Sequence, residues 1–252
     1  MLKTRVIPCL LLKNGGFVKT VRFSHPNYLG DPRNIVRIFN EKEVDEIVLL
    51  DITATVENRK PDFSLIREIV SEAFMPLGYG GGIRSIEDIK SLFKIGIEKV
   101  IINNFAVEKP EFIREASERF GSQSIVSAID VKNSLFGKYH VFSHSGRKKS
   151  ILSPEQHAKR MEELGAGEII LNSIDRDGTM VGYDLELIKR VSSAVSIPVI
   201  ASGGAGKLLH FKDAVEAGAS AVAAGSLFVY QGVHKAVLIN YPTQEELKEY
   251  LT

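Results

Sequence analysis

The sequence contains a single cysteine and no long hydrophobic run. Cys9 is the one cysteine among 252 residues, so no disulfide can form within the chain, which is typical of proteins from a reducing compartment. The chain also lacks the run of about 18 apolar residues that a transmembrane helix requires. Residues Met1 to Arg5 lead straight into an apolar run and show no signal-peptide pattern. We therefore expect a cytoplasmic protein with no membrane partner.

The sequence also has almost no net charge. Lys and Arg number 32 and Asp and Glu number 31, which gives a formal net charge of +1. No overall field then attracts the chain to nucleic acid or to an anionic membrane, so any phosphate must be bound locally. The six histidines lack the spacing of a metal site with a third ligand, and no Ser-His-Asp or Cys-His arrangement is visible. We expect no nucleic-acid partner, no metal and no other cofactor.

Two glycine-rich segments, Pro76–Arg84 and Pro198–Lys207, each begin with a short apolar stretch. Glycines that follow a strand leave backbone N–H groups open to an anion, and a helix that begins there adds partial positive charge. Each segment therefore predicts a phosphate site in a loop that opens a helix.

The two halves of the chain repeat one pattern at an offset of 122 residues. Pro76 and Pro198 share this offset, as do Gly96 and Gly218. A register kept across several elements indicates a duplicated half-domain. Eight strand-helix units in about 250 residues then predict an α/β fold, a (β/α)₈ TIM barrel built from two half-barrels in one domain over residues 1–252. A doubly wound sheet is the alternative, but it would leave open edges.

Apolar periodicity predicts the individual elements, and two segments depart from the alternation of strand and helix. Residues 13–30 read as a long loop with paired glycines, which we expect to act as a lid. Residues 138–144 alternate between polar and apolar side chains and predict a hairpin after the fifth strand. Among the other elements we expect strands over 6–12, 46–51, 100–103 and 124–130, and helices over 32–41, 62–73, 110–120 and 185–195.

Polar residues and glycines occupy the carboxyl ends of the expected strands, where (β/α)₈ barrels carry their catalytic and binding residues. Asp130 ends an otherwise apolar strand, so burial would raise its pKa toward a range useful for acid-base chemistry, although it could instead cap the next loop. Asp51 and Asp175 have the alternative role of tying loops together. The full set comprises Asp51, Gly80 to Gly82, Asn103, Asn104, Asp130, Asp175, Asp177, Gly203, Gly204 and Ser226.

Four charged residues of alternating sign stand at or next to strand starts, at the opposite end of the expected barrel. They are Arg5, Glu46, Lys99 and Glu168. On physical grounds alone, a ring of stabilising salt bridges is the ordinary explanation for such a set.

The chain resembles the cyclase subunit of imidazole glycerol phosphate synthase over nearly its whole length. The motifs that carry the resemblance are Arg5-Val-Ile-Pro-Cys-Leu, Leu50-Asp-Ile-Thr-Ala, Tyr79-Gly-Gly-Gly-Ile, Phe120-Gly-Ser-Gln, Ala128-Ile-Asp, Gly165-Ala-Gly-Glu-Ile, Ser173-Ile-Asp-Arg-Asp-Gly-Thr and Ala201-Ser-Gly-Gly-Ala-Gly.

This resemblance implies an ammonia-using cyclase (lyase) subunit of a glutamine amidotransferase. In that family a glutaminase partner docks on the barrel bottom, and ammonia passes through the barrel to a phosphate-bearing substrate at the top. The four-charge ring becomes an ammonia gate, and Asp130 and Lys19 become the catalytic residues. The resemblance assigns the substrate phosphates to Gly82, Asn103, Asn104, Asp177, Gly178, Gly204, Gly225 and Ser226.

One position departs from the family pattern, because Leu11 stands where the family carries an acid on the first strand. Residues 11–13, 19–23, 28–32 and 225–242 resemble a second, cyclase-like branch associated with acetamidino modification of N-acetylated sugars for surface polysaccharides. That branch implies an additional partner, an ATP-using protein that activates the amide.

Three further readings remain open from the sequence. The chain could be an authentic histidine-pathway cyclase without the first-strand acid, or a non-catalytic scaffold that channels ammonia. A phosphoribosyl isomerase on the same barrel is disfavoured, because its chemistry also uses an acid at both strand ends.

Overall fold

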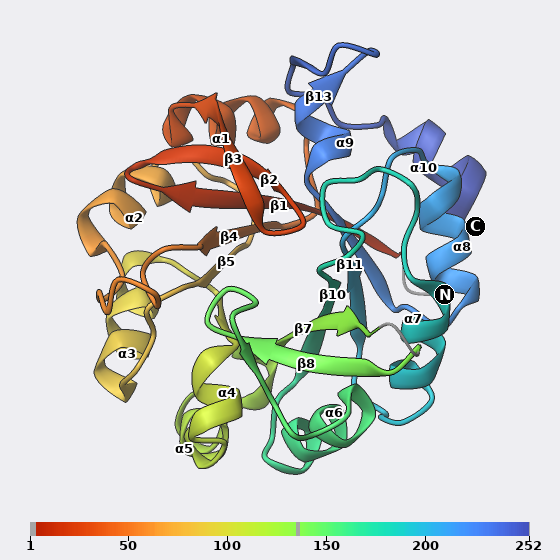
Figure 1. Ribbon diagram of the computed structural model, residues 1–252. Coiled ribbons are helices and arrows are strands. Elements are labelled where there is room, and N and C mark those ends of the chain that lie inside the picture. The colour runs from red at the N-terminus through yellow and green to blue at the C-terminus, as the bar shows by residue number, and fades with distance from the viewer. Residues whose placement is uncertain (1–3, 135–136, 252) are drawn as a thin grey trace.

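Eight parallel strands form a closed barrel in the computed structural model, which describes residues 4–134 and 137–251 (Figure 1). Each strand pairs with the next, and β12 pairs with β1 to close the cylinder. The prediction of a TIM barrel is confirmed. Met1 to Lys3, on which the absence of a signal peptide was partly argued, lie outside the described residues. The barrel strands are β1 (Arg5–Lys13), β4 (Ile47–Asp51), β5 (Leu77–Gly80), β6 (Lys99–Ile102), β7 (Ile125–Asn133), β10 (Glu168–Ser173), β11 (Val199–Ser202) and β12 (Ala221–Ala224).

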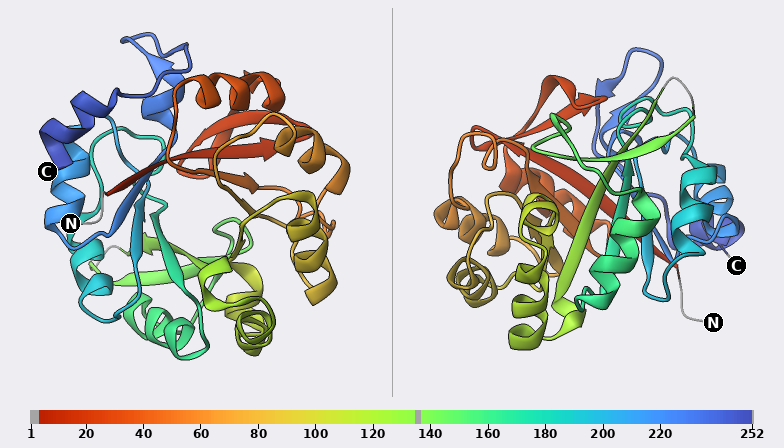
Figure 2. Two further views of the ribbon diagram at one scale, coloured as in Figure 1. Left: turned by 180° about the vertical axis from the view of Figure 1, so that it is seen from behind. Right: turned by 60° about the horizontal axis from the view of Figure 1, so that its bottom comes forward.

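Helices surround the strands as an outer layer (Figure 2). The repeat is visible in their caps, because Asp62 and Asp184, 122 residues apart, each accept a backbone N–H bond at the start of a helix. None of the helices in the described ranges is long and apolar enough to cross a membrane. The long helices are α1 (Pro32–Glu41), α2 (Phe63–Val70), α3 (Ile86–Ile95), α5 (Glu111–Phe120), α6 (Pro154–Glu163), α7 (Leu185–Ser192), α8 (Leu209–Glu216) and α10 (Gln244–Leu251).

Several short elements were not expected from the sequence. Helices α4 (Asn104–Glu108) and α9 (Ser226–Val229) follow β6 and β12 at equivalent places in the two halves. A 3₁₀ turn, η1 (Ser122–Ser124), precedes β7. After α9 the chain forms a small hairpin, β13 (Tyr230–Gln231) and β14 (Ala236–Val237), before it reaches α10.

The prediction of a long loop over residues 13–30 was wrong, because this segment is a β-hairpin that extends the sheet. Strand β2 (Gly16–Val21) runs antiparallel to β1, and β3 (Ser24–Gly30) runs antiparallel to β2. Asn14 and Gly15 both adopt positive φ in the turn between β1 and β2. An Asn-Gly pair is a strong hairpin signal for this reason.

The predicted hairpin after the fifth strand is confirmed. Strand β8 (Tyr139–Ser143) runs antiparallel to an extended β7, and β9 (Lys148–Lys149) pairs with β8. In the right-hand view of Figure 2, the β2–β3 and β13–β14 hairpins and the β7–β8 pair rise at the end of the barrel away from the N-terminus.

Alternate residues of each barrel strand face the barrel interior, and on β5 these residues are Gly78 and Gly80. On β1 the inward series is Arg5, Ile7, Cys9, Leu11 and Lys13, since side chains on a strand alternate between faces. The middle of the interior is an apolar cluster. Its members are Ile7, Val48, Ile101, Val126, Ile170, Ile200, Ala221 and Ala223, with Cys9, Leu50 and Ala128 packed against them.

Candidate active site and charged ring

A cavity of about 490 Å³ opens at the carboxyl ends of the barrel strands, and we call it the mouth. It brings together, from both halves of the chain, every residue to which the resemblance assigns catalysis or phosphate binding, and Leu11 lines it as well. Those residues are Lys19, Gly82, Asn103, Asn104, Asp130, Asp177, Gly178, Gly204, Gly225 and Ser226.

Asp130 points into the mouth from β7 and is held by two side-chain amides. Asn172 donates Nδ2–H to Oδ1 at 3.1 Å, and Asn103 donates Nδ2–H to Oδ2 at 3.3 Å. Burial raises the pKa of Asp130 to about 7; the hydrogen bond from Asn172 opposes this shift, and the nearby charge of Asp177 adds to it. A carboxyl with a pKa close to neutrality is suited to accept and release protons in a reaction.

Lys19 lies on β2, not on a mobile loop, and its side chain is only 6% exposed. Its Nζ forms an ion pair with Asp177 at 2.9 Å, and Thr20 donates Oγ1–H to the other oxygen of the same carboxylate at 3.2 Å. The charge of Lys19 is thus neutralised within the protein.

Each glycine segment leads into a helix, as predicted, because Ser85 is the N-cap of α3 and Leu208 is the N-cap of α8. Helix α3 begins at Ile86 and α8 at Leu209, several residues beyond the last mouth-lining glycine of each segment. Gly204 has a φ of +119°, and a Cβ there would collide with the carbonyl of Gly182. Gly225 leaves room for the stem of Lys19, whose Cε would lie 3.1 Å from a Cβ. Close packing at the mouth therefore accounts for these glycines without a ligand.

Ser226 presents a buried hydroxyl with no hydrogen-bond partner in the described part of the protein. The residue is 4% exposed and lines the mouth on the side of Gly204. At the equivalent place in the first half, Asn104 donates to Glu108, and its Oδ1 atom has no partner among the described residues. An unpaired buried hydroxyl is costly unless it bonds a ligand or water.

The bottom of the barrel carries a closed ring of ion pairs, which we call the charged ring. Arg5 contacts Glu46 and Glu168 at 2.5 Å each, and Lys99 contacts the same two carboxylates at 3.1 and 2.9 Å. Burial lowers the pKa of Arg5, but Glu168 and Glu46 together outweigh this effect, so its pKa is raised. The ring predicted from four strand starts is present and lies on the barrel axis below the apolar interior.

Two carboxylates at strand ends have structural roles. Asp51 accepts bonds from the backbone of Thr53 and Ala54 and pairs with Arg59, while Asp175 accepts the backbone N–H of Asn133 at 2.7 Å. Both tie loops together, which is the alternative role considered from the sequence.

Sequence reasoning missed Asn172 as a site residue. Asn172 lies beside Asp130 because β7 and β10 pair in a register that sets these two residues opposite each other. Its polar side chain at a strand end was the available signal. Cys9 lines the mouth, and burial raises the pKa of its thiol to about 12, which makes it a poor nucleophile.

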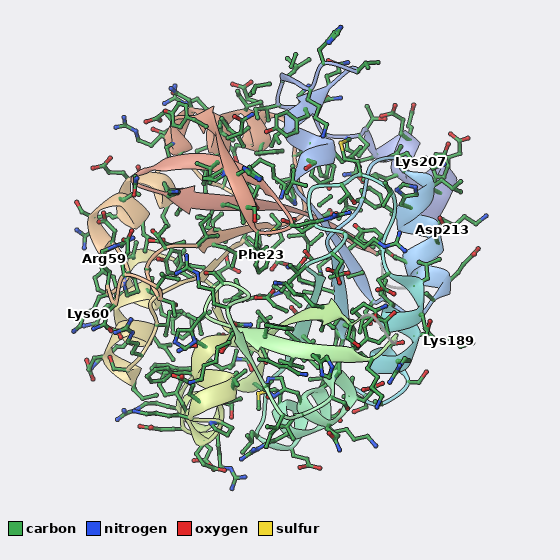
Figure 3. All side chains as sticks on the ribbon, viewed as in Figure 1. Phe23, Arg59, Lys60, Lys189, Lys207 and Asp213 are labelled. Carbon is green, nitrogen blue, oxygen red and sulfur yellow. The ribbon has the colours of Figure 1, made fainter. Side chains whose placement is uncertain are left out.

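The hairpin after the fifth strand was predicted, but its contribution to the mouth was not. Arg147 and His144 from this turn line the mouth. Phe23, at the turn between β2 and β3, projects over the middle of the barrel in Figure 3, and a Cβ on Gly146 would lie 3.2 Å from its ring. The two hairpins therefore meet above the mouth.

A polar mouth at one end and a charged ring at the other define the class of this protein as a (β/α)₈ barrel with a candidate ligand site at the carboxyl ends of its strands. A model of the family described as "Histidine biosynthesis protein" matches residues 5–235, and the chain belongs to that family.

The chain is similar to curated relatives over almost its whole length. A protein of Leptospira interrogans called "Putative imidazole glycerol phosphate synthase subunit HisF" is 51% identical over 98% of both chains. The "Putative imidazole glycerol phosphate synthase subunit hisF2" of Pseudomonas aeruginosa is also 51% identical, over 98% of this chain and 99% of the relative. The "Imidazole glycerol phosphate synthase subunit HisF" of Alkaliphilus metalliredigens is 47% identical over 92% of this chain and 93% of the relative. The chain is therefore a HisF-like protein.

Proposed function

We propose that the protein receives ammonia at the charged ring and delivers it through the barrel to a phosphate-bearing substrate in the mouth. The observation that carries the proposal is the placement of the ring. Two carboxylates and two cations close one end of an apolar interior whose other end opens between Asp130 and Lys19. Neutral ammonia passes an apolar interior at far lower cost than the ammonium ion, because burying an unpaired charge is strongly unfavourable.

The proposed donor of ammonia is a glutaminase subunit bound at the barrel bottom. Arg5 and Lys99 keep 29% and 18% of their side-chain surface exposed, so a partner on this face can reach the ring directly. Opening the ring requires one cation to leave both carboxylates. A docking partner that forms a new contact with that cation would compensate for the lost ion pairs.

The proposed phosphate sites lie on opposite sides of the mouth. Gly82, Asn103 and Asn104 form the first, and Asp177, Gly178, Gly204, Gly225 and Ser226 form the second. The unpaired hydroxyl of Ser226 supports the second site, since an anion there would satisfy a buried donor.

The finer proposal is formation of an acetamidino group on an N-acetylated sugar for surface polysaccharide. Ammonia attacks the amide carbon after an ATP-using partner has esterified the amide oxygen with a phosphoryl or adenylyl group. The new C–N bond forms, the C–O bond breaks, and the activating group leaves with the oxygen and the electron pair. Asp130 takes a proton from the added nitrogen. Leu11 supports this reading, because a leucine cannot supply the second proton transfer that ring closure in the histidine pathway would use.

The second candidate is an authentic imidazole glycerol phosphate cyclase of histidine biosynthesis. It is favoured by the names of the relatives and by the presence of possible phosphate sites on both sides of the mouth. A cyclase assay with ammonium salt and the histidine-pathway substrate distinguishes the two candidates. Wild-type turnover like that of ordinary cyclases would contradict the acetamidino reading. Activity that appears only in Leu11→Asp would show that the site has lost one acid.

The ammonia route is tested with Lys99→Ala and a glutaminase from the same organism. We expect the wild type to co-elute with the glutaminase and to stimulate glutamate formation. Lys99→Ala should leave glutamine hydrolysis running while less labelled amide nitrogen reaches the product. Lys90→Ala is the matched control, because Lys90 lies on α3 and pairs only with the neighbouring Glu87 among the described residues. If no glutaminase binds or responds to the wild type, the ammonia proposal fails.

A further inference from the structure

Two lysines occupy equivalent places at the outer edge of the mouth. Lys13 follows Leu11 by two positions on β1, and Lys132 follows Asp130 by two positions on β7. Alternate residues of a strand share a face, so each lysine continues the inward series of its strand by one step. Strands β1 and β7 lie four strands apart in either direction around the ring of eight. The two lysines therefore approach the opening from opposite sides of the barrel.

The turn after β8 adds a third cation beside Lys132. The Nζ atom of Lys132 donates to the carbonyl of Gly146 at 3.3 Å. Arg147 is the next residue of the chain and lines the mouth together with Lys13. We call Lys13, Lys132 and Arg147 the basic collar.

The same turn is also fixed to the wall that carries Lys13. Ser145 donates Oγ–H to the carbonyl of Ile52 at 3.0 Å. Ile52 in turn donates its backbone N–H to the carbonyl of Leu12, the neighbour of Lys13 on β1. The turn thus joins both sides of the opening and holds the collar together.

No carboxylate in the described part of the chain neutralises the collar. Lys13 and Arg147 have no hydrogen-bond or ion-pair partner there, and Lys132 contacts only the carbonyl of Gly146 and, at 5.0 Å, the ring of Phe142. The collar is therefore a patch of uncompensated positive charge, which attracts anions. The carboxylates that line the mouth have other partners: Asp177 pairs with Lys19, Asp51 and Glu57 pair with Arg59, and Asp130 accepts the amides of Asn103 and Asn172.

The phosphate sites proposed inside the mouth contain no unpaired cation. Their residues are glycines, asparagines, a serine and an aspartate, and Lys19 beside them is neutralised by Asp177. The collar lies on the solvent side of these residues, since its two lysines are half-buried and Arg147 is exposed. An anion at the collar would therefore belong to the part of the substrate that projects from the mouth.

We propose that the basic collar binds the diphosphate group through which a sugar is joined to its carrier. Both phosphoryl groups of such a linkage are ionised at neutral pH, and together they can contact cations from more than one side of the opening. The guanidinium of Arg147 can bind two phosphate oxygens at once, and the lysines act as point charges. This inference rests on the proposed function and adds the substrate class: diphosphate-linked sugars, in which the carrier is a nucleotide or an isoprenoid lipid.

Calorimetry with two pairs of probes tests the collar. The first pair is glucose 1-phosphate and UDP-glucose, and the second is geranyl phosphate and geranyl diphosphate. The wild type should bind the diphosphate of a pair about tenfold or more tightly than the monophosphate, the gain expected for one additional charge-assisted hydrogen bond. A gain in both pairs supports recognition of the diphosphate itself, and a gain in one pair supports the collar and identifies the carrier.

Substitution of the collar should remove this preference. Lys13→Gln, Lys132→Gln and Arg147→Gln should each lower the ratio of the two affinities by about threefold or more, because each removes one partly exposed positive charge. The triple variant should bind both members of a pair about equally. A ratio measured within one variant is insensitive to the fraction of protein that folds. Lys149→Gln is the matched control, because Lys149 lies on the same hairpin, contacts His140 and does not line the mouth.

The collar is overturned if the wild type prefers neither diphosphate, or if the triple variant keeps the wild-type ratio. If Ser226→Ala weakens phosphate binding while the collar variants change nothing, the sites inside the mouth stand and the collar is wrong. If the collar variants behave as expected while the glutaminase experiment fails, the collar stands and the ammonia route is wrong.

Discussion

Replacing Asp130 by asparagine should change the pH dependence of folding stability. Burial raises the pKa of Asp130 from an ordinary 3.8 to about 7. The folded protein then holds this proton more tightly than the unfolded chain does. Below about pH 4 the carboxyl is protonated in both the folded and the unfolded state, so it does not change the free energy of unfolding. As the pH rises it lowers the free energy of unfolding, and this loss reaches its full size above about pH 7.

The size of the effect follows from the shift in pKa. A pKa that rises from 3.8 to about 7, at roughly 1.4 kcal/mol for each pH unit, lowers the free energy of unfolding by at most about 4 kcal/mol. Asparagine does not titrate, so it escapes this cost. The free energy of unfolding of Asp130→Asn relative to the wild type should therefore rise by up to about 4 kcal/mol between pH 4 and pH 8.

Urea unfolding of both proteins across this pH range measures the difference directly. Altered hydrogen bonds to Asn103 and Asn172 shift it by an amount that does not depend on pH, and other titrating groups cancel in the comparison. A difference that stays constant from about pH 4 to about pH 8 would refute the argument. An NMR titration of the Asp130 carboxyl carbon in the wild type gives the same pKa independently.

Two further predictions concern single contacts at the mouth. Ser226→Ala should weaken the binding of inorganic phosphate by roughly tenfold or more, because a buried donor to the anion is lost. Ser220→Ala, at an exposed position, is the control and should leave the affinity unchanged. Equal affinities of Ser226→Ala and the wild type would show that Ser226 does not bind phosphate. Gly178→Ala should destabilise the fold more than Gly15→Ala. Both glycines have φ near +75°, but a Cβ on Gly178 would collide with the carbonyl of Thr20, whereas nothing lies within 4 Å at Gly15. Thermal unfolding compares them, and equal losses would mean that the β2–β3 hairpin is not held closely at Gly178.

The barrel could be predicted from the sequence because its signals are local and repeated. Parallel strands buried on both faces give continuous apolar runs, and the helices follow from apolar spacing and caps such as Asp31 before Pro32. The hairpin over residues 13–30 had one local signal, the pair Asn14-Gly15. Its second turn places Arg22 and Phe23 at positive φ without a glycine, and Arg22 is held there by a backbone bond to Asp177. No local pattern shows such a contact.

The residues at the two ends of each strand follow from the local sequence, and this is why the charged ring and most of the mouth could be predicted. Closure of the barrel decided how they combine. Glu46 and Glu168 come to share Arg5 and Lys99 only when strands far apart in sequence surround one axis. Asn172 meets Asp130 only through the register of two neighbouring strands. A strand's end is fixed by its own residues, whereas the partners of a side chain depend on every strand that closes the ring.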